Sequence, residues 1–578
     1  MIGSKLIAAV AAMAVGLALA VQPAFAEDAA GQWVGILKLP PPVGETHVGA
    51  RLKRAPDGAW SGAWTNIDQG GRGLALADIK TDGETLSFNT PARSSHFEGK
   101  WDPAKKAWVG TWSAGQLTAP IELARGVIPP APTVQGLDGD WDGALEVTGV
   151  RLRLAWHIAT TAEDGTYATI DSIDQGANGI PVSAISRDGG AVKFEIKLLG
   201  ASFQGALSAG GQTMTGQWSQ GGQTFPLSLT RRATGVAQPT LNRPQTPKPP
   251  FPYDAQEVSF DDASAKARLA GTLTLPPGKG PFPVVVLIAG SGPNTRDEPI
   301  LGHRIFLVLA DHLTRNGIAV LRYDKRGTGS STGDYAKATT ADFADDADAA
   351  VAFLKARPEI DPRHIGLIGH SEGGLIAPMV AVRNPQVAFI VMMAGPGVNG
   401  LDILMEQGRL ISKAYGADDA KLQKASALRQ QIFDIARTEK DPAIAAAKAR
   451  QAMTAAAKDL GVPESAIDAQ ADQITSDWFR FFLTYDPAPT LRKLRIPVLV
   501  LDGSNDLQVP PAQNLPPIRA ALAGDPDAEI HELPGLNHLF QTSKTGSPAE
   551  YGRIEETIAP ASLDLMTAWI ARHTAPKA

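Results

Sequence analysis

Short apolar runs recur along the second half of the chain, and each is bounded by glycine, proline or charged residues. Such runs are typical of strands that are buried on both faces of a parallel sheet. We predict six of these strands, at residues 284–288, 318–323, 365–368, 388–393, 497–501 and 529–533.

Helical patterns separate these strands. We expect helices at residues 304–315, 342–357 and 374–382. The first is closed by Asn316-Gly317, and Asp342 supplies a cap charge at the N-terminus of the second. Because strand and helix alternate, the predicted fold class is α/β, with a doubly wound parallel sheet in a domain at residues 256–578. Ligands of such sheets bind beyond the carboxyl ends of the strands.

Between the fourth and fifth strands lies a long insertion, at about residues 398–489. Its alanine-rich sequence has apolar positions at helical spacing and predicts helices at residues 419–438, 442–460 and 466–483. The last of these contains an aromatic cluster that includes Trp478 and Phe482. Two interpretations are open: a helical cap that controls entry to an active site, or a peripheral layer of helices.

Residues 31–232 lack a helical stripe, and their short alternating segments predict all-β antiparallel structure. Motifs recur there at a spacing of 106 to 108 residues, among them Gly31-Gln32-Trp33 with Gly139-Asp140-Trp141 and Gly110-Thr111-Trp112 with Gly216-Gln217-Trp218. We therefore expect two tandem β-rich repeats, at residues 27–130 and 131–235, each a small barrel or sandwich. The recurring tryptophans indicate either the cores of these units or a platform that contacts a glycan.

Prolines are dense between the two halves of the chain, at residues 236–255. Such composition favours an extended, semi-rigid linker over a packed element. Relative motion of the two halves and a β-rich lobe docked over the active site are both compatible with this segment.

The first residues of the chain predict export. Lys5 precedes an apolar segment at residues 6–21, and Ala24-Phe25-Ala26 offers small residues at the positions that a signal peptidase reads. We expect a signal peptide at residues 1–26 and a periplasmic or secreted protein. The chain has no cysteine, which excludes lipid attachment at one, and no later segment predicts a membrane anchor. The formal net charge of −6 argues against nucleic acid as a partner.

A serine flanked by glycines follows the third predicted strand. In Gly369-His370-Ser371-Glu372-Gly373 a strand leads into the turn and a helix leaves it. A serine on such a turn needs a strained backbone with close neighbours, so the positions two before and two after it must lack side chains. Gly369 and Gly373 meet this demand, and Ser371 is therefore the candidate nucleophile.

A serine nucleophile needs a histidine base and a carboxylate that orients the base, and on this fold they follow in the order Ser, acid, His. His538 lies in a loop just past the sixth strand and is the candidate base. Asp506 stands in the loop beyond the fifth strand and is the candidate acid, with Asp502 at the strand tip as the alternative. His531 and His573 are expected to be packed or solvated.

Together these motifs resemble the α/β-hydrolase superfamily, specifically secreted bacterial esterase-like members related to dienelactone hydrolases and to prolyl-oligopeptidase catalytic domains. The resemblance covers the chain from about residue 257 onward. Leu287-Ile288-Ala289-Gly290-Ser291-Gly292-Pro293 is similar to the family's oxyanion loop, and Asp324-Lys325-Arg326-Gly327-Thr328-Gly329-Ser330-Ser331 resembles its D-x-R-G-x-G-x-S turn. The family pattern implies the same roles for Ser371, Asp506 and His538. Ala289 departs from the pattern, because many members carry histidine there.

The chemistry implied by these residues is acyl transfer to water through an acyl-enzyme intermediate. The expected oxyanion donors are the backbone N–H of Glu372 and one from the Gly290-Ser291 turn, assigned to Ser291. The predicted substrate is a small-molecule carboxylic ester. A peptidase or thioesterase on the same fold is the alternative, and an envelope- or carbohydrate-binding protein with a vestigial hydrolase lobe is an alternative of another class.

No cofactor and no metal are expected, because the sequence has no His-Glu-x-x-His motif, no phosphate-binding glycine-lysine loop and no cysteine. Some polar residues near the motifs have two interpretations. Arg296-Asp297 and the turn from Asp324 to Arg326 indicate either substrate contact or structural pairing. His370, inside the elbow, is expected to pack.

Overall fold

The computed structural model describes residues 28–39, 44–70, 72–91, 95–114, 117–147, 150–220, 223–460 and 464–575. The predicted signal peptide at residues 1–26 lies outside these ranges. Among the helices within them, none is both long enough and apolar enough to span a bilayer.

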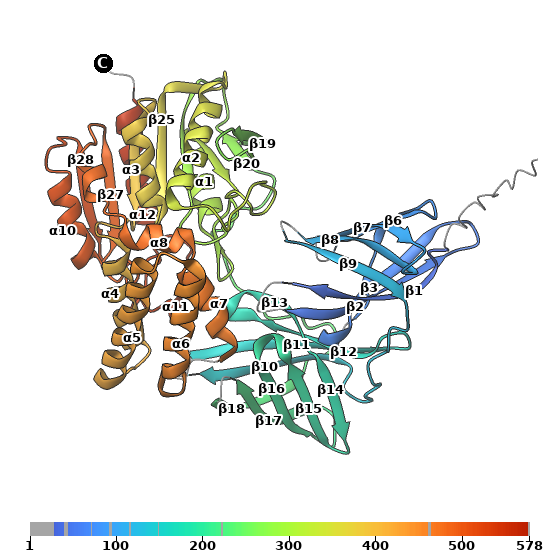
Figure 1. Ribbon diagram of the computed structural model, residues 1–578. Coiled ribbons are helices and arrows are strands. Elements are labelled where there is room, and N and C mark those ends of the chain that lie inside the picture. The colour runs from blue at the N-terminus through green and yellow to red at the C-terminus, as the bar shows by residue number, and fades with distance from the viewer. Residues whose placement is uncertain are drawn as a thin grey trace, which may run out of the picture.

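An eight-stranded sheet forms the centre of the C-terminal part of the chain (Figure 1). Its strands, in spatial order, are β19 (Asp254–Asp262), β20 (Ala267–Leu275), β24 (Ala319–Tyr323), β21 (Phe282–Ile288), β25 (Ile360–His370), β26 (Val387–Met393), β27 (Val498–Gly503) and β28 (Ala528–Leu533). From β24 to β28 all neighbours run parallel. All six predicted strands are present, because burial on both faces selects apolar sequence.

Helices cover both faces of this sheet, and they are α1 (Ile305–Arg315), α2 (Thr340–Lys355), α3 (Gly373–Arg383), α10 (Pro511–Ala521), α11 (Pro548–Tyr551) and α12 (Pro560–Thr574). On one face Val284 and Val286 pack in a core with residues of α2, α3 and α10. On the other, Val285 and Leu287 pack with residues of α1 and α12. Successive residues of one strand thus enter two different cores, which is the doubly wound arrangement.

Asp342 lies in the first turn of α2 and supplies the predicted charge, and the helix begins two residues before the predicted start. Thr339 is the cap, since its hydroxyl accepts from the N–H of Asp342, while the Asp342 carboxylate accepts from the N–H of Thr339 at 2.8 Å. The two residues form a reciprocal capping box, which the spacing Thr-x-x-Asp encodes.

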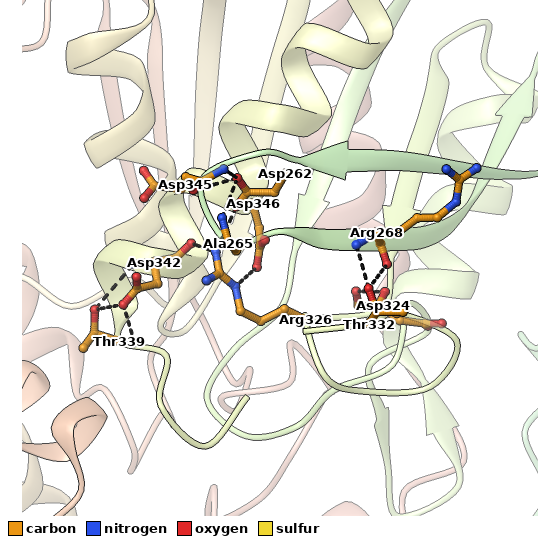
Figure 2. Close-up of polar contacts among 12 residues, drawn as sticks. Asp262, Ala265, Arg268, Asp324, Arg326, Thr332, Thr339, Asp342, Asp345 and Asp346 are labelled. Carbon is orange, nitrogen blue, oxygen red and sulfur yellow. Dashed lines mark hydrogen bonds and ion pairs between the residues drawn. The ribbon is translucent and has the colours of Figure 1, made fainter. Parts of the chain in front are cut away.

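The sequence did not predict β19 and β20. They form an antiparallel hairpin at the edge of the sheet, and β20 pairs with β24. Arg326, in the loop after β24, ties this hairpin to α2 (Figure 2). Its Nη2 donates to Asp262 at the end of β19 (3.0 Å) and its Nε donates to Asp346 (2.8 Å). The Arg326 side chain is therefore structural and does not reach the site described below.

The insertion after β26 is helical. It comprises α4 (Gly400–Ala414), α5 (Asp419–Thr438), α6 (Pro442–Leu460), α7 (Glu464–Ile474), α8 (Asp477–Thr484) and α9 (Ala488–Leu491). The single helix predicted at residues 466–483 was wrong: the chain breaks at Thr475 and Ser476, where the Ser476 hydroxyl accepts from the N–H of Phe479 and starts α8. In Figure 1 these helices extend from the eight-stranded sheet toward the nearer of two β-sheets.

Two antiparallel sheets form the N-terminal region. The first contains β1 (Gly31–Lys38), β2 (Glu45–Arg54), β3 (Trp60–Asn66), β4 (Leu74–Ala75), β5 (Ala77–Thr81), β6 (Thr85–Thr90), β7 (Ser95–Asp102), β8 (Ala107–Ala114) and β9 (Leu117–Arg125). The second contains β10 (Gly139–Val147), β11 (Val150–Thr161), β12 (Gly165–Ser172), β13 (Ala177–Pro181), β14 (Ala184–Asp188), β15 (Ala191–Ile196), β16 (Ala201–Leu207), β17 (Thr213–Gln220) and β18 (Gln223–Arg231). Their strand orders, β4-β3-β2-β1-β9-β8-β7-β6-β5 and β13-β12-β11-β10-β18-β17-β16-β15-β14, correspond strand by strand.

Local features also correspond between the two sheets. The guanidinium of Arg125 lies 4.1 Å from the Trp33 ring, and that of Arg231 lies 4.2 Å from the Trp141 ring. Trp33, Trp141 and Trp218 are buried in the cores of their sheets. These three recurring tryptophans are core residues and offer no platform to a sugar.

The proline-rich segment packs along the α/β domain. Arg243 donates to the carbonyl oxygens of Leu301 (2.9 Å), Gly552 (2.8 Å) and Ile554 (3.0 Å). The prediction favoured an extended linker over a packed element; the segment has no helix or strand before β19, but it does contact the α/β domain, and these bonds hold it in place.

Candidate active site

Ser371 directly follows β25 at the carboxyl edge of the sheet. Its φ of 54° is left-handed, and its N–H donates to Met393 O of β26 at 2.8 Å. A Cβ added at Gly369 would lie 1.9 Å from Gly373 O, and one added at Gly373 would lie 2.1 Å from Ile288 O. Both contacts are far too close for a side chain, so glycine is required on each side of this strained serine.

The structure brings His538 and Asp506 together. His538, after β28, and Asp506, after β27, are both buried, and His538 Nδ1 lies 2.7 Å from Asp506 Oδ2. An ionised carboxylate only accepts hydrogen bonds, so Nδ1 carries the hydrogen and Nε2 keeps its lone pair. Asp506 Oδ1 accepts from the N–H groups of Gln508 (2.6 Å) and Val509 (2.9 Å), which fixes the carboxylate.

Asp502, the other candidate acid, lies at the end of β27 and does not bond to His538. Its side chain is buried, and neither of its oxygens receives a hydrogen bond within the described part of the chain. Burial, and after it the nearby Asp506 charge, raise the pKa of Asp502 well above its usual value. Both causes favour the protonated form of Asp502.

The turn after β21 offers one backbone donor rather than two. The N–H of Gly290 donates to Glu298 Oε1 at 2.7 Å and is thereby occupied. The Gly290 carbonyl accepts from Lys325 Nζ (2.7 Å) and from Asn294 Nδ2 (2.9 Å), so the loop is held from its other side as well. Ser291 is the residue of this turn whose N–H is left for a ligand.

The buried ion pair of His370 and Glu298 connects the loop after β21, the turn of Ser371 and the loop of His538. His370 Nδ1 lies 3.0 Å from Glu298 Oε1, and His370 Nε2 lies 3.0 Å from His538 O. Both ring nitrogens face oxygen acceptors, which favours the imidazolium. Although burial opposes it, the charge of Glu298 raises the pKa of His370 above its usual value. His370 is buried, as expected, and it also connects the turn after β21 to the loop of His538.

The side chain of Glu372 is a second buried junction. Its Oε2 accepts from Lys325 Nζ (3.1 Å), and its Oε1 accepts from Thr340 Oγ1 (2.7 Å) and from Trp478 Nε1 (2.6 Å). Trp478 belongs to α8 of the insertion. The residue after the candidate nucleophile therefore holds the helical insertion against the elbow.

The candidate active site lies in one pocket of about 370 Å³. Ser291, Ser371, Glu372 and His538 line it together with side chains of α4 and α8, among them Leu404, Gln407, Trp478 and Phe482. The insertion therefore covers the pocket and is not a layer remote from it.

The remaining sequence candidates lie elsewhere. Arg296 pairs with Asp324 at 2.8 Å, and Asp297 pairs with Arg322, so both are structural. His531 lies 3.4 Å from Glu529 within β28, and His573 bonds to Trp569 O in α12.

Sequence reasoning missed Glu298, Lys325 and Asn294. Each follows a strand of the parallel sheet at its carboxyl end, and that position is the signal that identifies them. Their contacts depend on loops that meet only in the folded chain.

Comparisons with known proteins agree with this architecture. A family model described as serine aminopeptidase, S33, matches residues 303–543. Esterase EstD of Thermotoga maritima is 29% identical over 308 residues, which are 53% of this chain and 66% of EstD, just under two thirds. Acyl-coenzyme A amino acid N-acyltransferase 2 of Rattus norvegicus is 33% identical over 133 residues, 23% of this chain and 28% of that protein.

Among solved structures, the α/β hydrolase GrgF from Penicillium sp. sh18 is 19% identical, with a TM-score of 0.36. The overlap covers 56% of this chain and 100% of that one.

Proposed function

Since the C-terminal part of this chain is an esterase-like domain of the α/β-hydrolase superfamily, we propose that the protein hydrolyses carboxylic esters with Ser371 as the nucleophile. The observation that carries the proposal is the 2.7 Å bond between His538 Nδ1 and Asp506 Oδ2 in the pocket of Ser371. It fixes the tautomer in which Nε2 can accept a proton.

The proposed reaction has two halves. His538 Nε2 takes the proton of Ser371 Oγ while Oγ attacks the ester carbonyl, and the departing alcohol then takes that proton. An acyl-serine remains. Water attacks it with His538 again as base, the acid leaves, and Ser371 regains its proton. Asp506 stabilises the imidazolium in both halves.

The proposed oxyanion site is formed by the N–H groups of Ser291 and Glu372. Gly290 is not included because its N–H is bonded to Glu298. One such donor contributes roughly 3 to 4 kcal/mol of transition-state stabilisation. The bonds from Lys325 and Asn294 to the Gly290 carbonyl keep the Ser291 N–H in a fixed orientation.

The lining of the pocket favours an ester over the substrate of an aminopeptidase. An aminopeptidase has to hold the ammonium group of a peptide, and an uncompensated carboxylate is the group that does so. The pocket contains two carboxylates, Glu298 and Glu372, and each is already paired with a cation, His370 or Lys325. A thioesterase remains the alternative within this chemistry.

The other parts of the chain receive supporting roles in the proposal. The insertion acts as a cap that controls substrate entry, supported by the contacts of α4 and α8 with the pocket. The two antiparallel sheets are tandem copies of one unit, supported by their matching strand orders. The predicted leader supports export to the periplasm or beyond. A binding protein with a vestigial hydrolase lobe is the competing proposal.

A substrate panel tests the function. Purified protein should hydrolyse para-nitrophenyl esters of short acids, and faster than the matching thioesters and amino-acid para-nitroanilides. Ser371→Ala should lose this activity by at least 10⁴-fold. The control Ser330→Ala, at an exposed position, should keep it. An inactive wild type, or full activity in Ser371→Ala, would overturn the proposal.

A further inference from the structure

A second cavity lies beside the catalytic pocket, within the helical insertion. Its volume is about 840 Å³. Leu404 and Gln407 of α4 line both cavities, so the two spaces adjoin. Gln223, the first residue of β18, closes part of the far wall. The catalytic mechanism makes no use of this space.

Most of the wall is apolar. Its large apolar side chains come from α4, α5, α6, α7 and α8 and are Ile411, Leu428, Ile432, Phe433, Met453, Ile474 and Phe479. From Leu404 to Ser412, the residues of α4 that line it, the helix rises about 12 Å. The cavity can therefore take an extended apolar chain of medium length.

Two cationic side chains, Lys421 and Arg429, interrupt this apolar wall, and Arg429 is the more enclosed of the two. Arg429 of α5 is partly buried, and its Nη1 is enclosed without a hydrogen-bond acceptor in the described part of the chain. Burial lowers the pKa of Arg429, and no carboxylate contributes to that shift. The guanidinium lies against Gly408, where an added Cβ would be 2.2 Å from its Cζ.

Other arginines of these helices are paired. Arg409 bonds to Glu406 and Arg437 bonds to Asp434. Among the described residues, the charged side chains that line the cavity are Lys421 and Arg429, both cationic, with no Asp or Glu beside them. The local charge therefore favours an anion.

An enclosed guanidinium nitrogen without an acceptor, as at Arg429 Nη1, is costly because its lost hydration is not replaced. A carboxylate supplies what is missing, since its two oxygens match the planar fork of arginine. The combination of an apolar wall and one unpaired arginine thus defines a ligand with an apolar chain and an anionic end.

We propose that this cavity binds the far end of an ester substrate whose straight acyl chain terminates in a carboxylate. The inference rests on the proposed esterase function and names its substrate class. The ester carbonyl lies at Ser371, the chain passes Leu404 and Gln407, and the terminal carboxylate pairs with Arg429. A sulfate or phosphate end shares the same chemistry, and ligands carrying those groups form further arms of the test.

Paired substrates test the proposal. The para-nitrophenyl half-ester of decanedioic acid should have a higher kcat/KM than para-nitrophenyl decanoate. Arg429→Met should lower the ratio of the two values by about ten- to hundredfold, the effect expected from losing a charge-assisted hydrogen bond. Gly408→Ala should also lower the ratio, because its Cβ displaces the guanidinium. Arg437→Met, on the same helix but outside the cavity, should leave the ratio unchanged.

Binding separates this inference from the function on which it rests. Decanedioate should bind to the Ser371→Ala variant more tightly than decanoate does, by calorimetry, and Arg429→Met introduced into that variant should remove the difference. Equal binding of the two acids, or a ratio that Arg429→Met does not change, would overturn the inference while leaving the esterase proposal intact. Retained hydrolysis in Ser371→Ala would instead overturn the esterase proposal, and the binding result would still decide whether Arg429 holds the anion.

Discussion

Two buried carboxyl groups near the site have different surroundings. Asp506 accepts from His538 and from two backbone N–H groups, which hold it in place. Asp502 has no such donors in the described chain, and burial together with the Asp506 charge raises its pKa. The same residue type therefore orients a histidine in one place and lies without a hydrogen-bond donor in the other.

Replacing each of these two aspartates by asparagine should have different effects on kcat. Asp506→Asn should lower kcat by about 10⁴-fold, because the imidazole loses the group that sets its tautomer. Asp502→Asn should lower kcat by less than about tenfold, since Asp502 does not bond to His538 and the amide keeps the shape of the side chain. Steady-state kinetics of both variants measure this. Equal losses would contradict the assignment of the acid.

A third carboxyl group acts through its neighbours. Glu298 holds the Gly290 N–H and the ring of His370, which in turn bonds to His538 O. Glu298→Gln keeps the shape but removes the charge that stabilises the imidazolium. We expect kcat to fall by about tenfold with KM nearly unchanged, because positioning in the transition state is lost and ground-state binding is not.

The control for this variant is Glu359→Gln, which lies just before β25, at the amino end of the strand that carries Ser371. Glu359→Gln should leave both kcat and KM unchanged. A rise in KM without a change in kcat for Glu298→Gln would assign Glu298 to substrate binding instead of positioning.

At the residue scale, the sequence predicted Ser371, Asp506 and His538 because each follows a strand in a fixed chain order. The structure brings His538 and Asp506 into contact and places Ser371 in the same pocket. Glu298, Lys325 and Arg429 could not be predicted. Their significance lies in which atoms they meet across the fold, and local sequence does not carry that information.

An aromatic side chain of the helical insertion, Trp478, bonds to the turn that carries Ser371. Trp478 of α8 donates to Glu372 and stacks on Phe482, with ring centroids 5.4 Å apart. The bond spans two elements that are far apart in the sequence. It fixes how closely α8 covers the pocket.

Trp478→Phe should loosen this cover while preserving the stacking. The lost bond to a buried carboxylate costs about 1.5 to 3 kcal/mol, so we expect kcat/KM for a simple aryl ester to fall by about tenfold or more. The relative rates for short and long acyl chains should also change. The control is Phe481→Leu, because Phe481 is on the same helix but does not line the pocket. An unchanged substrate profile in Trp478→Phe would contradict the role of α8 as a cap.

At the element scale, continuous apolar runs predicted the parallel strands well because those strands are buried on both faces. The hairpin of β19 and β20 escaped prediction, since β19 is mostly exposed or half-buried and has no such run. The break between α7 and α8 also escaped, because the apolar spacing continues across Ser476 and only the cap bond reveals it.

One buried cluster joins the edge hairpin to the rest of the α/β domain. Arg326 is shared by Asp262 and Asp346. Although burial opposes it, hydrogen bonds from Ser264 lower the pKa of Asp262, so Asp262 is the ionised partner of Arg326. Burial raises the pKa of Asp346 to about 7. Two acids that share one guanidinium do not both ionise readily.

This cluster predicts a pH dependence of stability. The folded protein binds the Asp346 proton more tightly than the unfolded chain, in which the pKa is near 3.8. The free energy of unfolding should therefore decrease as pH rises from about 4 to about 7 and then level off. Asp346→Asn should reduce this slope, because asparagine does not titrate. Urea unfolding of both proteins at about pH 5 and about pH 8 checks this. Parallel pH profiles would contradict it.

At the scale of the whole molecule, the division into a β-rich first part and an α/β second part follows from hydropathy patterns. The packing of the proline-rich segment does not, because composition reports stiffness and not contacts. Arg243 fixes that segment to three backbone carbonyls of the α/β part. Asn242 and Gln245 of the same segment add bonds to Glu555 and Ile558, so a few side chains, and not the composition, decide how the parts join.

Covalent labelling tests the central claim most directly. A fluorophosphonate reacts with a serine only where a base and an oxyanion site activate it. We predict that peptide mapping by mass spectrometry finds one label, on Ser371, and that Ser371→Ala and His538→Ala remain unlabelled. A label on another serine, or normal labelling of His538→Ala, would contradict the account.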